Sequence, residues 1–264
     1  MESFKIFQTN TLSQGLQSKY PEINNYIIQS VDHPGIYGRI DMTYQGFHAI
    51  IKTGADYVYI DPALDRNTQK YMVYNRKDAI NTKTFHCYSK TEDIRDQMEV
   101  RSARISDNKM RTYRMALSCT GEYAQFHGGT VPLVLSAMNT TINRVNFVYE
   151  QEYAVRFEII ANTDLLINLN PLTDPYDNDD IDMQLDQNQI ECDIKIGNSN
   201  YDIGHIFSTG GGGLAGYAVA CKSNTKAWGG TGSSKPINDP FDIDYVAHEV
   251  GHQLSGSHTQ NNKC

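Results

Sequence analysis

The sequence HEVGHQLSGSH, residues 248–258, contains two histidines four positions apart and a third histidine six positions after the second. In a helix with 3.6 residues per turn, His248 and His252 project from one face, one turn apart. Two imidazoles in this arrangement can bind one Zn²⁺, and Glu249 points beside the metal toward the position of a bound water. This stretch therefore predicts a helix that carries a zinc site.

His258 cannot lie on that helical face unless the helix ends before it. Gly256 is expected to end the helix, because glycine readily adopts the positive φ that stops one. The chain can then turn back and bring His258 to the metal as the third ligand, which leaves a fourth position open, as a catalytic site requires. The alternative is an amphipathic helix that happens to contain histidines, but all three histidines and Glu249 fall at the offsets that zinc binding needs.

The residues around these ligands predict a helix that is buried on one side. Its start is expected to be capped by Asp239-Pro240 or by Asp242. The apolar stripe consists of Ile243, Val246, Ala247, Val250 and Leu254.

The composition is that of a soluble globular protein, with 39% hydrophobic and 20% charged residues among 264. The 23 basic and 31 acidic side chains give a net charge of −8, which argues against nucleic acid as the main partner. No apolar run approaches the ~20 residues of a membrane span.

Neither the ends of the chain nor its cysteines define a cellular compartment. Residues 1–5 lack the charged and apolar regions of a signal peptide, which is typical of a cytoplasmic protein or of a fragment. The sequence stops at Cys264, six residues after the last predicted ligand, which favours a fragment. The cysteines are compatible with two disulfides and a free thiol, or with a fully reduced chain. They are Cys87, Cys119, Cys192, Cys221 and Cys264.

Residues 1–88 are expected to form a β-rich region, because 36–42 and 47–51 alternate apolar and polar residues and 57–60 is rich in β-formers. Residues 89–110 are charged and nearly free of large apolar side chains, as in a linker. Residues 111–264 are predicted to form the domain that carries the zinc site.

Within this domain, strands are expected at 113–117 and 155–159, with a long amphipathic helix between them that begins near Pro132. A further helix is suggested by Met183, Gln187, Ile190 and Ile194, and two short strands are expected around the glycines 210–213. This order predicts an α/β fold with a mostly parallel sheet. The helix pattern is Val131, Leu135, Met138, Ile142, Val145 and Tyr149.

Two other patterns have simpler interpretations than the binding sites that they resemble. Residues 211–216 satisfy G-x-G-x-x-G, but 217–221 are expected to continue as a strand, whereas dinucleotide binding needs a helix there. The acidic residues in 174–182 could bind Ca²⁺, but they lack the glycine and the terminal glutamate of an EF-hand loop. A solvated loop is the preferred interpretation, and Ca²⁺ remains a second candidate cation.

The domain resembles the metzincins, specifically the bacterial reprolysin-like (adamalysin-type) zinc metallopeptidases. The resemblance implies a twisted, mostly parallel five-stranded sheet with the active-site helix beneath a substrate cleft. It also implies that Gly213, Leu214 and Ala215 belong to an edge strand that binds an extended peptide. The motifs that carry it are Thr120-Gly121-Glu122-Tyr123, Asn143-Arg144-Val145-Asn146, Tyr201-Asp202-Ile203-Gly204-His205, Gly213-Leu214-Ala215, Asp239-Pro240-Phe241 and the zinc helix.

Residues 1–85, with Gly46-Phe47-His48-Ala49 and Tyr59-Ile60-Asp61-Pro62, are similar to the pro-segment that precedes the catalytic domain in such proteins. Secretion and synthesis as a zymogen are implied by the same resemblance. Two features depart from the family pattern. Ser255 stands where the family has glycine, which costs ~1–2 kcal/mol if the residue is left-handed, and the chain ends before the methionine-containing turn expected beneath the metal.

The favoured function is that of a secreted zinc endopeptidase that acts on protein or peptide substrates. His248, His252 and His258 would hold Zn²⁺, and Glu249 would act as general base on the attacking water. The alternatives are a non-catalytic zinc-binding, peptide-binding or adhesion module, and a zinc hydrolase of a non-peptide substrate. Cys87 could reach the fourth zinc position and silence the enzyme, although a packed structural cysteine or a disulfide partner is the preferred interpretation.

Overall fold

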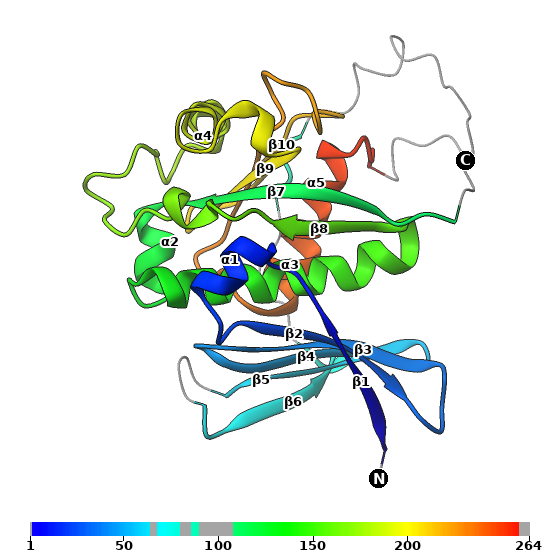
Figure 1. Cartoon of the computed structure of the whole chain (residues 1–264). Helices are drawn as coiled ribbons and strands as arrows, with labels where there is room; N and C mark the ends of the chain where they lie inside the picture. The colour runs from blue at the N-terminus through cyan, green and yellow to red at the C-terminus, as the bar shows by residue number, and fades with distance from the viewer. Residues whose placement is uncertain (1, 64–67, 80–85, 90–107, 259–264) are drawn as a thin grey trace.

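The computed structural model describes residues 2–63, 68–79, 86–89 and 108–258 (Figure 1). Two β-sheets lie on opposite sides of a long helix, and further helices cover the second sheet. The predicted mixed α/β class is therefore confirmed. Most of the predicted charged linker, 90–107, lies outside the described residues.

The first sheet, here called the N-terminal sheet, has six antiparallel strands in sequence order. Three of them coincide with the predicted strands at 36–42, 47–51 and 57–60. The strands are β1 (Phe4–Thr9), β2 (Asn24–Ser30), β3 (Ile36–Thr43), β4 (Gly46–Thr53), β5 (Asp56–Pro62) and β6 (Tyr71–Asn75). Helix α1 (Gln14–Lys19) separates β1 from β2, and the short helix η1 (Arg76–Asp78) follows β6.

The second sheet, here called the central sheet, has five strands in the order β10-β11-β9-β7-β8. All neighbouring pairs are parallel except the edge pair of β10 and β11. The strands are β7 (Arg111–Cys119), β8 (Val155–Ile159), β9 (Ile203–Ser208), β10 (Gly212–Ala215) and β11 (Gly229–Gly232).

Helix α3 (Val131–Tyr153) begins with Pro132 in its first turn, as predicted, and runs between the two sheets (Figure 1). The predicted apolar stripe packs into the core of the central sheet. The opposite side of the helix is also buried, including Asn139, Asn143 and Arg144, because the N-terminal sheet covers it. Since these residues are polar, the sequence suggested a solvent-facing side that the structure does not have.

Helix α4 (Ile181–Lys195) exists where it was predicted, but the apolar residues used to find it face outward. Met183, Ile190 and Ile194 are 50%, 56% and 73% exposed. Asn188 is buried instead, where its amide donates to the Ala227 carbonyl at 2.8 Å and its carbonyl oxygen accepts from Ser118. These buried hydrogen bonds turn the polar side of the helix toward the sheet.

Residues 217–221 do not form the predicted strand. They form turns, in which Ala218 and Cys221 have positive φ angles of 54° and 65°. The strand that pairs with β10 is instead β11, a glycine-rich segment that shows no hydrophobic alternation. Within the described residues, no helix combines the length and hydropathy that crossing a bilayer requires.

Candidate metal centre

The predicted zinc helix is a continuous helical segment with a π-helical first part, η5 (Pro240–Ala247), followed by α5 (His248–Gln253). Neither predicted cap operates at its start. Asp239 occupies the N-cap position without a side-chain capping bond. Asp242 is buried, where it accepts hydrogen bonds from Thr141 at 2.6 Å and Arg144 at 2.9 Å. Packing against α3 has therefore taken the carboxylate away from the helix terminus.

The structure brings the three predicted ligands together. The Nε2 atoms of His248 and His252 are 3.0 Å apart, and both lie close to Nε2 of His258, at 3.3 and 3.2 Å respectively. Nitrogen ligands placed tetrahedrally at zinc bond lengths of 2.0–2.1 Å would be separated by about 3.3 Å. The triad therefore has the donor type and spacing that a zinc ion needs.

Burial supports the neutral, metal-binding form of these rings. Burial, and then the neighbouring His252 and His258, lower the pKa of His248 to about 4. Nδ1 of His252 lies 2.7 Å from the Gly256 carbonyl oxygen, to which it can donate. With its proton on Nδ1, the ring presents the Nε2 lone pair to the centre of the triad.

The turn that returns His258 to the cluster differs from the predicted one. Ser255, and not Gly256, takes the left-handed conformation, with φ of 83°. The helix ends at Gln253, so the residue that must reverse the chain falls one position before the glycine. Ser255 thus occupies the place of the family's glycine despite the strain of a left-handed serine.

Cys87 completes the cluster, together with the three histidines. Its Sγ lies 3.3 Å from Nε2 of His258 and 3.5 Å from Nε2 of His252. With a Zn–S bond of 2.3 Å, a tetrahedral thiolate would lie about 3.5 Å from each nitrogen. Cys87 is free, so it is not the disulfide partner that the sequence left open, and its position favours the fourth zinc ligand over a purely structural cysteine. The four cysteines within the described part of the chain, Cys87, Cys119, Cys192 and Cys221, are free.

Residues 86–89 lie along edge strand β10, where the resemblance placed a substrate. Cys87 forms a parallel β-bridge with Gly213. The Gly213 N–H donates to the His86 carbonyl, and the Tyr88 N–H donates to the Gly213 carbonyl, both at 2.9 Å. A short piece of the chain itself thus adds a strand to the edge that Gly213, Leu214 and Ala215 form.

Glu249 is fully buried beside the cluster. Its Oε2 lies 3.0 Å from the hydroxyl of Ser89, which also accepts from the Ala215 N–H at 2.8 Å. A β-carbon at Gly213 would overlap the Glu249 carboxylate, so this position in β10 requires glycine. Burial raises the pKa of Glu249 to about 7, which suits a group that accepts and returns a proton near neutral pH.

Gln253, at the end of α5, and its partner His205 hold the helix in place, and the sequence predicted a role for neither of them. Gln253 is fully buried, and its Oε1 lies 2.9 Å from Nδ1 of His205, while its amide donates to the Gly204 carbonyl at 2.8 Å. The other ring nitrogen of His205 lies 2.9 Å from the Thr231 hydroxyl. These contacts attach the last turn of α5 to β9 and β11. No spacing rule links these positions, so only the fold reveals them.

Two buried histidines outside the cluster make stability depend on pH. Burial lowers the pKa of His127 to about 3 and that of His205 to about 4. Both rings are therefore neutral when folded and protonate near pH 6.5 when unfolded. Their stabilising contribution is complete above pH 6.5 and is lost as the pH falls from there toward the folded pKa values. Each should lower the free energy of unfolding by up to about 1.4 kcal/mol per pH unit in that range.

Urea unfolding at pH 7, 6 and 5 measures this dependence. His127→Gln removes one of the two titrating rings, so the dependence on pH should become shallower although the variant itself is less stable. An equally steep loss of stability in wild type and variant would contradict the assignment.

Residues 135–259 match the family model described as metallo-peptidase family M12B, reprolysin-like. The match contains most of α3, four of the five strands of the central sheet and all three histidines of the cluster. No curated protein matches the chain. The match supports a reprolysin-like metzincin, the family that the sequence motifs predicted.

Proposed function

We propose that the chain is a zinc-dependent endopeptidase whose cleft is closed by residues 86–89. The observation that carries the proposal is the convergence of three imidazole nitrogens 3.0–3.3 Å apart, beside a buried carboxylate and the edge strand β10 that residues 86–89 cover. The M12B match supports a peptidase.

His248, His252 and His258 would hold Zn²⁺, which supplies Lewis-acid chemistry and polarises the carbonyl of the scissile peptide. Glu249 would take the proton of the attacking water on its carboxylate and pass it to the leaving amine. Burial of Glu249 keeps its affinity for this proton close to the value that such a transfer needs.

A peptide substrate is supported by the way in which β10 is used. Its backbone N–H and C=O groups at Gly213 bind the chain's own extended residues 86–88, so an extended peptide can make the same bonds. A non-peptide substrate would be favoured by a closed pocket at the cluster, and an adhesion role by the absence of a general base. Neither condition fits an edge strand that pairs with an extended peptide segment and has Glu249 beside it.

The proposal includes latency, as in a zymogen. The Cys87 thiolate would occupy the fourth zinc position, and Ser89 would hold the Glu249 carboxylate, so the two groups that act on a substrate are both engaged. Secretion, which the family resemblance implies, is part of the same proposal. Calcium remains a prediction for the acidic residues in 174–182.

Replacing Cys87 by serine tests this function. Serine keeps the shape but loses the soft thiolate ligand, so hydrolysis of an unfolded protein substrate should rise by roughly tenfold or more. Cys221→Ser, at an exposed cysteine, is the matched control and should leave the rate unchanged. A metal chelator should abolish the increase. Equal rates in wild type and Cys87→Ser would contradict the inhibitory role of Cys87. Hydrolysis that resists chelation would contradict the assignment as a zinc peptidase.

A further inference from the structure

The N-terminal region shares its core with the peptidase domain. Leu12, Leu16 and Ile23 are all fully buried, and they belong to the same cluster as Met115 of β7 and Met138 of α3. A segment that only covered a finished domain would contribute residues of intermediate exposure at its contact surface. These side chains instead fill the interior on which the central sheet is packed.

The same region also extends the central sheet. Leu12 forms a parallel bridge with Ile159 of β8. The Ser13 N–H donates to the Ile159 carbonyl, and the Ile159 N–H donates to the Thr11 carbonyl, both at 2.8 Å. One side of β8 pairs with β7, and residues 11–13 cover the other side, where the backbone groups would otherwise have no strand beside them.

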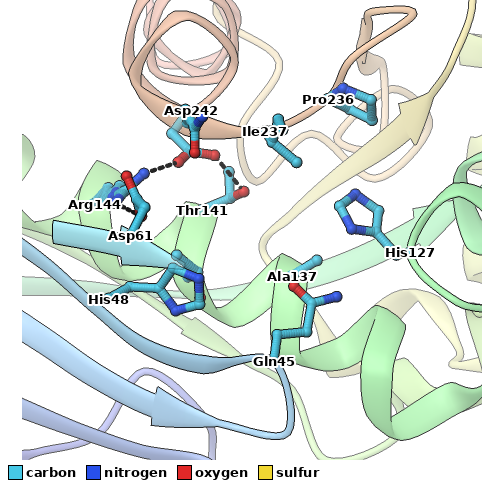
Figure 2. Close-up of a pocket in the computed structure, with 12 residues that line it drawn as sticks. Gln45, His48, Asp61, His127, Ala137, Thr141, Arg144, Pro236, Ile237 and Asp242 are labelled. Atoms are coloured by element: carbon cyan, nitrogen blue, oxygen red, sulfur yellow. Dashed lines mark hydrogen bonds and ion pairs between the residues drawn. The ribbon is translucent and has the colours of Figure 1, made fainter. Parts of the chain in front are cut away.

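Buried ion pairs connect the N-terminal sheet to α3, and α3 to η5. Arg144 of α3 is 2% exposed and lies between Asp61 of the N-terminal sheet, at 2.5 Å, and Asp242 of η5, at 2.9 Å (Figure 2). Arg39 of β3 binds Glu150 of α3 at 2.7 Å. Separating the N-terminal sheet from α3 would break the Arg144–Asp61 and Arg39–Glu150 ion pairs. Each surface would then keep a buried guanidinium or carboxylate that has lost an ion-pair partner.

We infer that residues 2–63 remain bound to residues 108–258 after any cut between Ser89 and Asn108, so the processed protein is a non-covalent pair of fragments. The partner that this interface recognises is the N-terminal fragment of the same chain. A pro-segment that dissociates would take Leu12, Leu16 and Ile23 out of the core. The inference depends on this packing alone and not on the proposed peptidase activity.

A specific protease site inserted between Ser89 and Asn108 of the full chain provides the test. After complete cutting, size-exclusion chromatography at about 1 μM protein and in 1 M NaCl would be followed by mass spectrometry of each fraction. Both fragments are expected in one species near the 29.8 kDa of the intact chain. Separate elution of the N-terminal fragment from a C-terminal fragment that keeps its near-ultraviolet circular dichroism would overturn the inference.

Two variants determine which contacts hold the fragments. Leu16→Ala leaves a cavity in the shared core, so exchange of a labelled N-terminal fragment into the cut protein should become roughly 10- to 1000-fold faster. Ile6→Ala, at a β1 residue that is 60% exposed, is the control and should exchange like the wild type. Equal exchange in all three proteins would show that the shared core does not hold the fragments together, which would also contradict the inference.

Discussion

Replacing Glu249 by glutamine is expected to lower peptide hydrolysis by ~10²-fold or more, with zinc binding unchanged. Glutamine has the same shape but cannot accept the proton of the attacking water. Glu249 is not one of the predicted metal ligands, so all three histidines remain and the zinc should stay bound. The comparison is best made in protein that also carries Cys87→Ser, in which the cleft is predicted to be open.

The control for this experiment is Glu191→Gln on α4. Glu191 pairs with Lys195 at 2.9 Å and takes no part in the cluster, so its replacement should leave both rate and zinc content unchanged. A Glu249→Gln protein that retains its zinc and its full rate would show that Glu249 is not the base. Loss of zinc in that protein would show instead that the carboxylate supports the metal site.

Arg144→Ala is expected to have the largest effect on stability, about 3–5 kcal/mol less free energy of unfolding. The substitution leaves the Asp61 and Asp242 carboxylates buried without their cation. Burial already raises the pKa of Asp242 to about 6 even with Arg144 present, which shows how strongly this site disfavours an unpaired charge. Urea unfolding at pH 7 measures the loss.

Arg114→Ala is the matched control for this change. Arg114 also pairs with a carboxylate, that of Asp202 at 2.8 Å, but its side chain is 47% exposed. Water replaces much of what an exposed pair loses, so a cost of about 0–1 kcal/mol is expected. Similar losses in the two variants would mean that the buried network around Arg144 does not stabilise the contact of the N-terminal sheet with α3 and η5.

The metal ligands could be predicted from the sequence because helical periodicity is local. His248 and His252 fall one turn apart whatever surrounds them, and Glu249 follows from the same helix. The turn before His258 was placed one residue late, because the helix ends at Gln253 and Ser255 must reverse the chain. Glycine preference indicated Gly256, but the position of the helix end decides which residue takes the positive φ.

The features that were missed depend on contacts between distant parts of the chain. Cys87 was considered as a fourth ligand but not preferred, because it lies more than 150 positions before the histidines that it meets and no local pattern connects them. The partners of Asn143 and Arg144 lie in β3, β5 and η5, so the helical pattern around these residues could not show that the polar side of α3 is buried. In α4, the pattern of Met183, Gln187, Ile190 and Ile194 predicted the helix but not its buried face, which buried amide hydrogen bonds determine.

The central claim is that His248, His252 and His258 hold one zinc ion, and the metal content of the purified protein tests it most directly. The wild-type chain should carry about one zinc per molecule, since its three nitrogens and one thiol make a complete tetrahedral set. His252→Ala removes one of the three nitrogen ligands, so this variant should lose the zinc while Cys221→Ser retains it. A zinc content that His252→Ala leaves unchanged would contradict the account.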